Sequence, residues 1–244
     1  MGQALAEGLG ALEQFSLVAL VDRRTPGDLF GAAHHSTLDE VTASDVDVVV
    51  DFSSPDGVAA STNWCVANGV ALVVGTTGLT AEQRTALVGA GERVGVVVAA
   101  NFSVGAVLAE RFAAMAAPYF DGVEIIELHH DRKVDAPSGT SMAAAVTIAA
   151  ARRRAGRAPL GDPTRHVAHE GARGADVDGG VRVHSVRLPG LVAHEEILFG
   201  SPGEGLRIRH DSYDRQSFVR GVALAINAID SRPRLVEGIS TLVP

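Results

Sequence analysis

Residues 124–141 read EIIELHHDRKVDAPSGTS, and the rest of the chain is organised around them. The stretch opens with the mixture of apolar and polar side chains that is typical of a half-buried strand. Pro137 and Ser138 then occupy the positions that a helix start favours, ahead of an alanine-rich run over residues 142–151. Because the first turn of a helix presents free N–H groups and a partial positive charge, it suits an anion. The stretch therefore predicts a strand end beside an anion-binding helix start.

Five side chains that carry charge or protons lie between these two elements: His129, His130, Arg132, Lys133 and Asp135. Imidazoles and an ammonium beside an anion-binding helix start indicate a site for a negatively charged small molecule whose chemistry needs protons. Adjacent residues on a strand point to opposite faces, so His129 and His130 are poorly placed to bind one metal ion. The chain has neither an HExxH motif nor a cysteine cluster, and no metal is expected. From spacing alone, a structural or surface role for the two histidines stays open.

The same stretch resembles the dihydrodipicolinate reductase family, which catalyses the second committed step of bacterial lysine and diaminopimelate synthesis. The pattern of that family is E-[IV]-x-E-x-H-x-x-x-K-x-D-x-P-S-G-T-[GA]. Ser141 departs from its final small residue, a change that we do not expect to matter. The residues that fit the pattern are Glu124, Glu127, His129, Lys133, Asp135, Pro137, Ser138, Gly139 and Thr140.

Composition narrows the class of protein further. Hydrophobic residues make up 46% of the 244, enough for a packed core. The net charge of −8 argues against nucleic acid as a partner, so an anionic substrate would have to be drawn by local basic residues. Cys65 is the only cysteine and stands in an apolar helical pattern, which predicts a buried, inert thiol and no disulfide. With no signal peptide and no apolar run of membrane-spanning length, we expect a cytoplasmic protein and no membrane partner.

Short apolar strands alternate with helices through the first part of the chain, which predicts an α/β fold with a doubly wound parallel sheet. The later strands alternate apolar and polar residues instead, which indicates a second α/β domain with a mixed sheet. We expect a Rossmann-type dinucleotide-binding domain over residues 1–102 and 216–244, and a substrate-binding and oligomerisation domain over 103–215. The expected strands are 16–21, 46–52, 70–74, 95–100, 181–188, 192–199 and 206–210, and the expected helices are 1–15, 55–68, 81–91, 104–120, 142–151 and 217–229.

The strand over residues 16–21 ends in Asp22 and Arg23, followed by a second arginine. In a Rossmann unit the second strand ends in an acidic residue that binds the adenosine ribose, and a nearby arginine can take a 2′-phosphate. A Rossmann unit also has a first strand and a glycine-rich turn ahead of its first helix. Gly2 resembles the last glycine of that turn. We therefore expect the chain to lack about a dozen residues of that unit. On that reading its first domain folds poorly and binds nucleotide weakly.

The resemblance implies reduction of 4-hydroxy-tetrahydrodipicolinate, a small dicarboxylate, with NADH or NADPH as cofactor, by a chain that forms a homotetramer through the sheet of its second domain. It implies His129 as general acid and Lys133 as second proton donor or charge stabiliser. The substrate carboxylates would be held by His130, Gly139, Thr140 and Arg215. The nicotinamide half of the cofactor would meet two segments that follow strands: Gly75, Thr76 and Thr77, and Ala99, Ala100, Asn101 and Phe102.

Two other classes of function stay open. Another two-domain nicotinamide oxidoreductase, such as a semialdehyde dehydrogenase, would need a catalytic cysteine or a different basic site, and the helical setting of Cys65 disfavours it. A shortened, non-catalytic member of the family is the other alternative.

Overall fold

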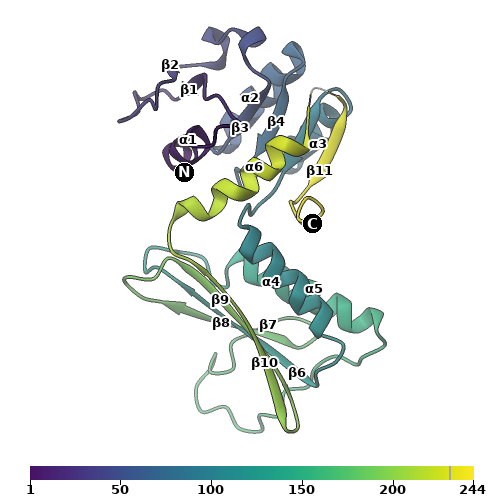
Figure 1. Ribbon diagram of the computed structural model, residues 1–244. Coiled ribbons are helices and arrows are strands. Elements are labelled where there is room, and N and C mark those ends of the chain that lie inside the picture. Colours follow the sequence, from purple (N-terminus) through teal and green to yellow (C-terminus); the bar gives the residue numbers. More distant parts are fainter. Residues whose placement is uncertain (231) are drawn as a thin grey trace. The chain divides into compact units, whose positions relative to one another are not determined.

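The computed structural model describes residues 1–230 and 232–244 and divides into two compact units, each described here by itself (Figure 1). The first unit comprises Met1–Val104 and Arg215–Pro244, and the second Gly105–Asp214. None of the helices in the described part of the chain is long and apolar enough to cross a membrane.

The first unit contains parallel sheets with helices, which confirms the predicted Rossmann-type class. A four-stranded sheet has the order β11-β5-β4-β3, and a separate two-stranded sheet pairs β1 with β2; all neighbours in both run parallel. Helices α2 and α3 pack side by side against the larger sheet, and α6 packs against β4 and α1. The strands are β1 (Ala19–Val21), β2 (Ala33–His35), β3 (Val48–Asp51), β4 (Ala71–Val74), β5 (Gly95–Val98) and β11 (Arg234–Glu237). The helices are α1 (Gly2–Gly10), α2 (Pro55–Asn68), α3 (Ala81–Gly91) and α6 (Val219–Ala228), with short 3-10 turns η1 (Leu38–Glu40), η2 (Ala43–Asp45) and η3 (Arg215–Phe218).

Local chemistry explains where these elements begin. Ser54 accepts a hydrogen bond from the N–H of Gly57 and is followed by Pro55, so α2 begins there. Thr80 and Gln83 form a capping box at the start of α3. Cys65 is fully buried in α2, and burial, together with the charge of Asp51, raises the pKa of its thiol to about 12, which makes it inert as expected.

Within the described residues, β1 and β3 each pair with a neighbouring strand on one side only. The parallel strands of this unit thus fall into two sheets, in which β1 and β3 are edge strands. Burial differs between the inside and the edge of the larger sheet. All four residues of the inner strand β4 are buried, whereas Val48, Val49 and Val50 of the edge strand β3 are only partly buried.

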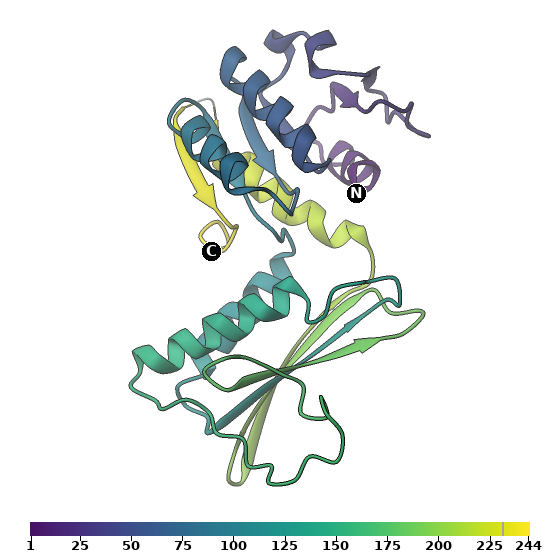
Figure 2. The same cartoon turned by 180° about the vertical axis from the view of Figure 1, so that it is seen from behind.

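The second unit is a five-stranded mixed sheet of order β10-β9-β6-β8-β7, as predicted. Its central pair, β6 and β8, is parallel, and the other neighbours are antiparallel. Helices α4 and α5 cover one face of this sheet (Figures 1 and 2), and the core between helices and sheet includes Ile148 of α5 and, from the strands, Ile125 and Ile197. The elements are α4 (Val104–Ala116), β6 (Gly122–His129), α5 (Gly139–Arg154), β7 (Ala175–Asp178), β8 (Val181–Arg187), β9 (Ala193–Ser201) and β10 (Glu204–Ser212).

Three strands and several boundaries differ from the expectation. Helix α1 ends at Gly10 and not at residue 15, strand β1 begins at Ala19 and not at residue 16, and α5 and β10 are longer at both ends than the expected 142–151 and 206–210. The sequence analysis leaves β2, β7 and β11 as loop, because each has three or four residues and a polar composition. Helix α4 ends at Ala116 and not near residue 120. The guanidinium of the buried Arg152 donates to the carbonyls of Ala117 (2.9 Å) and Phe120 (2.6 Å), which satisfies the backbone that follows the helix.

Gly221 in α6 packs directly on the segment that follows β5. A Cβ at position 221 would lie 1.9 Å from the carbonyl oxygen of Phe102, so we expect Gly221→Ala to lower the free energy of unfolding by about 1–3 kcal/mol. Gly89 in α3 has no neighbouring heavy atom within 4 Å of the same point, and Gly89→Ala should stabilise by up to about 1 kcal/mol. Urea denaturation of both variants beside the parent chain tests this packing, and equal destabilisation by the two would contradict it.

Candidate active site

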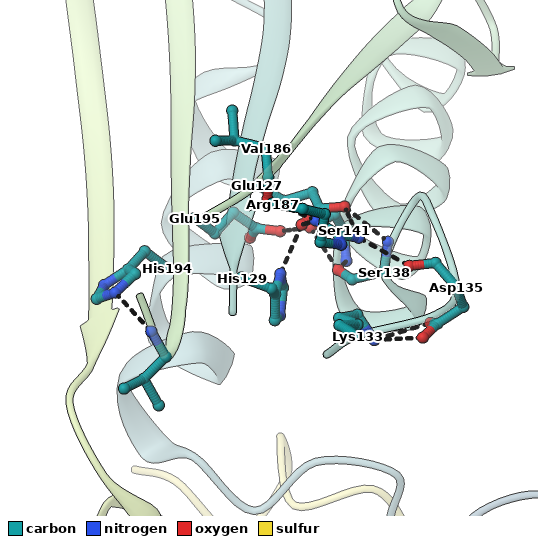
Figure 3. Close-up of polar contacts among 11 residues, drawn as sticks. Glu127, His129, Lys133, Asp135, Ser138, Ser141, Val186, Arg187, His194 and Glu195 are labelled. Carbon is teal, nitrogen blue, oxygen red and sulfur yellow. Dashed lines mark hydrogen bonds and ion pairs between the residues drawn. The ribbon is translucent and has the colours of Figure 1, made fainter. Parts of the chain in front are cut away.

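Strand β6 carries two titratable side chains on the face that α4 and α5 cover. Burial alternates along the strand, with Val123, Ile125 and Glu127 buried and the residues between them partly exposed. His129 follows in the same alternation, so it lies on the same face as Glu127, at the carboxyl end of the strand. The apolar core thus gives way to a carboxylate and an imidazole where β6 ends (Figure 3).

The Glu127 carboxylate is fully buried and has both oxygens occupied. Arg187 of β8 pairs with it in bidentate fashion, Nη1 to Oε2 at 2.7 Å and Nη2 to Oε1 at 2.8 Å. Oε2 also lies 2.5 Å from Nδ1 of His129, and Oε1 accepts the backbone N–H of Ser138 at 3.2 Å. Burial alone would raise the pKa of Glu127, but the hydrogen bonds from Arg187 and His129 outweigh it and lower the pKa. The side chain is therefore an anion at neutral pH.

The His129 imidazole meets three charged groups. Burial lowers its pKa below the ordinary value, the Glu127 carboxylate raises it in part, and the cations Lys133 and Arg187 add to the lowering. The net direction is downward, so the free protein holds His129 as a neutral imidazole at neutral pH. Bound anions would move the pKa in the opposite direction.

Lys133 lies in the turn after β6 with its ammonium partly covered. Nζ donates to both carboxylate oxygens of Asp135 at 2.8 Å. The carbonyl of Asp135 accepts from Nη2 of Arg187 at 2.8 Å, which ties this turn to the Glu127 group. Lys133 is also the only lysine in the chain, where the other 20 of the 21 Lys and Arg residues are arginines.

Helix α5 begins at Gly139 with Ser138 as its cap. The Ser138 hydroxyl accepts from the N–H of Ser141 at 3.2 Å. The first N–H groups of a helix have no acceptor inside it, and Gly139 and Thr140 are exposed to solvent. A helix start with free N–H groups therefore lies where the sequence predicts it, and the Ser138 N–H links it to the Glu127 carboxylate.

Ser141 has a larger part in this helix start than the sequence analysis expects. Its buried hydroxyl accepts from Ser138 Oγ at 2.9 Å and donates a short hydrogen bond to Glu195 of β9. Burial, with the charges of Glu110 and Glu127, raises the pKa of Glu195. A glycine or alanine at position 141 would leave Glu195 without this hydrogen bond, so the serine is not equivalent to the residues that the family pattern has there.

The other predicted substrate residues lie in different places. His130 is the first residue after β6, and its buried Nδ1 has no hydrogen-bond partner within the described residues. Arg215 belongs to the first unit, in the turn η3, where the neighbouring Gln216 donates to Glu7 of α1 at 3.3 Å. The second unit therefore gathers His129, Lys133, Gly139 and Thr140 around one carboxylate, whereas Arg215 belongs to the first unit.

The predicted cofactor residues lie where strands of the first unit end. Asp22 and Arg23 follow β1 and are exposed, and the Asp22 carboxylate accepts the N–H of Arg24 at 2.8 Å. The first turn of α1 begins at Gly2, where a Cβ would meet no atom within 4 Å. An exposed carboxylate, an adjacent guanidinium and open space at a helix start suit the ribose and phosphates of a dinucleotide.

The two segments expected near nicotinamide each combine exposed and buried side chains. Thr77, Ala100 and Asn101 have exposed or partly exposed side chains. Thr76, Ala99 and Phe102 are buried, and the Thr76 hydroxyl donates to Asp51 at 3.1 Å. Gly75 packs on the ring of Phe52, which a Cβ would approach to 2.1 Å. The buried members therefore shape the turns, and only their backbone is available to a ligand.

Sequence reasoning missed Arg187 and Glu195 as members of the site. Both come from strands that lie more than fifty residues after β6 and meet it only through pairing, Arg187 opposite His129 and Glu195 opposite Glu127. The alternation in β8 and β9 indicates which residues share a face, but the register between strands is not local information. A parallel sheet of the Rossmann type in one unit, with an imidazole, an ammonium and a helix start close together in the other, is the arrangement of a two-domain nicotinamide-nucleotide oxidoreductase.

Comparison with known proteins gives the family. Residues 1–102 match the model described as dihydrodipicolinate reductase, N-terminus, and residues 105–242 match dihydrodipicolinate reductase, C-terminus. The chain therefore belongs to the dihydrodipicolinate reductase family, which confirms the resemblance carried by residues 124–141.

Relatives and solved structures agree with that assignment. The chain is 48% identical over 242 residues to the 4-hydroxy-tetrahydrodipicolinate reductase of Nocardia farcinica, covering 98% of this chain and 92% of that one. It is 46% identical to the enzyme of the same name from Streptococcus suis, covering 100% and 95%. A dipicolinate-bound dihydrodipicolinate reductase from Paenisporosarcina superimposes with a TM-score of 0.83 at 40% identity, covering 98% and 94%.

Proposed function

We propose that this protein reduces 4-hydroxy-tetrahydrodipicolinate to tetrahydrodipicolinate with NADH or NADPH, in the synthesis of diaminopimelate and lysine. The observation that carries the proposal is the buried Glu127–His129 pair beside the start of α5, in a chain of this family. That arrangement offers an imidazole for proton transfer and backbone N–H groups for a carboxylate in one place.

The substrate is a dicarboxylate and needs two sites for negative charge. Gly139 and Thr140 offer one, through the first N–H groups of α5 and the Thr140 hydroxyl. His130, Lys133 and Arg215 are the proposed partners of the other carboxylate. The dipicolinate that is bound to the relative from Paenisporosarcina is a ligand of the same chemical kind.

The overall reaction adds a hydride and a proton to the ring and releases water. When bound, the nicotinamide supplies the hydride. Asp22 and Arg23 would hold the adenosine end of the cofactor. The segments 75–77 and 99–102 would hold the nicotinamide end, through the exposed side chains of Thr77 and Asn101 and the backbone of the buried positions.

The chain's own residues supply protons and charge. His129, whose Nδ1 is held by Glu127, delivers a proton from Nε2 to the ring once bound carboxylates favour the imidazolium. Lys133 exchanges Asp135 for the substrate and stabilises the negative charge that develops as hydride arrives.

The proposal is tested by following NADPH absorbance when substrate is formed in the cuvette from pyruvate and aspartate semialdehyde. We expect oxidation that requires both precursors and the synthase that condenses them. Oxidation with aspartate semialdehyde alone would instead favour the alternative class of semialdehyde oxidoreductases.

Both nicotinamide cofactors should serve, because opposing groups follow β1. The Asp22 carboxylate accepts hydrogen bonds from a free ribose 2′-OH and repels a 2′-phosphate, whereas Arg23 and Arg24 pair with that phosphate. We expect kcat/KM for NADH and NADPH to lie within about a thousandfold of each other. Steady-state kinetics with each cofactor measures the ratio, and a larger preference for either would contradict this balance.

A homotetramer formed through the second unit belongs to the same proposal. Helices α4 and α5 cover one face of its sheet (Figure 2), while the opposite face carries partly exposed apolar side chains, among them Ile126, Leu128 and Leu198. Light scattering on the purified chain should give four times the mass of one chain.

We also propose a cytoplasmic location. The free thiol of Cys65 is in keeping with it.

A further inference from the structure

The proposed proton donor can act from only one ring nitrogen, and the surroundings of His129 decide which one. A neutral imidazole carries its proton on either Nδ1 or Nε2, and the form that protonates Nε2 is favoured in water. Nδ1 of His129 lies 2.5 Å from Oε2 of Glu127. A carboxylate accepts and does not donate, so as long as Glu127 is ionised the proton lies on Nδ1.

Arg187 keeps Glu127 ionised. Its two guanidinium nitrogens meet the two carboxylate oxygens at 2.7 and 2.8 Å, and the planar fork fits a carboxylate in this bidentate manner. Glu127 has no solvent exposure, so no water can replace Arg187 as its partner. The guanidinium also donates to the carbonyl of Asp135, which fixes its own position.

The same carboxylate reaches the helix start. Oε1 of Glu127 accepts the N–H of Ser138, the residue that caps α5 directly before Gly139 and Thr140. One buried anion therefore orients both the imidazole and the helix start, the two parts of the site that must face a single substrate.

We propose that Glu127, held by Arg187, is a positioning residue that fixes His129 with a proton on Nδ1 and reserves Nε2 for proton exchange with the substrate. The effect of this role on catalysis rests on the proposed function, whereas the position of the proton on the His129 ring is a property of the free protein. Glu127 itself does not touch the reacting atoms.

The chain contains a matched control on the same strand. Glu124, three residues earlier on the opposite face, forms the same kind of group with an imidazole and a guanidinium. Its Oε2 lies 2.7 Å from Nε2 of His184, and Arg173 pairs with the same carboxylate. Glu124→Gln therefore removes an equivalent carboxylate from β6 without touching His129.

Nitrogen-15 NMR reports the tautomer directly. Long-range proton–nitrogen spectra of the histidine-labelled chain, with His129 assigned by its loss in His129→Gln, should show a protonated Nδ1 and an unprotonated Nε2 at neutral pH. In Glu127→Gln the signals should move to the Nε2-protonated form, whereas Glu124→Gln should leave them in place. A His129 that keeps its tautomer in Glu127→Gln would overturn the proposal, whether or not the chain reduces the proposed substrate.

Kinetics tests the consequence for the reaction. Glu127→Gln should lower kcat by about 10- to 100-fold with a smaller change in KM, while Glu124→Gln leaves kcat within about twofold. Glu127→Gln leaves the charge of Arg187 without its partner, which can disturb the fold by itself. The double variant that combines Glu127→Gln with Arg187→Leu lacks that charge and serves as a second test. If either variant shows the changed tautomer but turns over like the parent, Glu127 has no positioning role. A parent chain that shows the Nδ1 tautomer but no turnover would count against the proposed function alone.

Discussion

Replacing His129 by alanine should lower kcat by about 10²- to 10⁴-fold and leave the fold intact. The loss follows from removal of the only imidazole on the face of β6 where the helix start of α5 lies. The fold survives because Glu127 keeps Arg187 and the Ser138 N–H as partners, so no buried charge is left alone. We expect the free energy of unfolding to change by less than about 1 kcal/mol.

Steady-state assays and urea denaturation on the same preparation measure both quantities. His184→Ala is the control, since His184 has the same kind of carboxylate partner but lies on the opposite face of the sheet. His129→Ala with the turnover of the parent chain would show that the imidazole is not the acid.

The same assignment fixes the direction of the pH dependence. If His129 is the general acid, as proposed, its protonated form is the active one, and kcat/KM should fall as pH rises through the pKa of His129 in the free protein. Burial and the cations Lys133 and Arg187 place that pKa below about 6.5, despite the opposing pull of Glu127. This fall of kcat/KM with rising pH should be absent from the residual activity of His129→Ala.

Replacing Lys133 by alanine should lower kcat by about 10²-fold or more and also raise KM, because the ammonium is proposed to meet both the bound anion and the charge that develops during hydride transfer. Asp135 loses its partner in this variant, but its carboxylate is exposed and stays hydrated, so the fold should be retained.

Lys133→Arg separates charge from proton donation. A guanidinium keeps the positive charge at all working pH values and does not give up its proton, so this variant should recover much of the KM and little of the kcat. Full recovery of kcat by arginine would contradict a proton-donor role and leave Lys133 as a fixed charge. Reductive methylation labels lysine side chains and the N-terminal amine, and Lys133 is the only lysine of the chain, so peptide mapping of the labelled protein verifies that Lys133 is accessible.

Those parts of the fold that depend on local chemistry could be predicted from the sequence. Helix α3 has the expected bounds, Ala81–Gly91, because a capping box at Thr80 begins it. Strand β4 is an unbroken apolar run that is buried along its whole length, as a parallel strand covered on both faces must be. Strand β2, with the sequence AHH, is defined only by its pairing with β1, and no local pattern marks it.

The candidate site divides in the same way. His129, Lys133, Gly139 and Thr140 lie within one short stretch, so spacing and the family pattern are enough to bring them together. Arg187 reaches that stretch only through the register of two parallel strands, and its bidentate grip on Glu127 could not be foreseen. The importance of Ser141 was also hidden, since its partner Glu195 comes from β9.

Transfer of a labelled hydride tests the central claim most directly. NADPH carrying deuterium at both C4 positions is incubated with the chain and freshly formed 4-hydroxy-tetrahydrodipicolinate, and the product is analysed by mass spectrometry, with His129→Ala as the control. The proposed function predicts tetrahydrodipicolinate that contains one deuterium, formed at a far lower rate by the variant. Unlabelled product, or labelled product formed equally fast by His129→Ala, would contradict it.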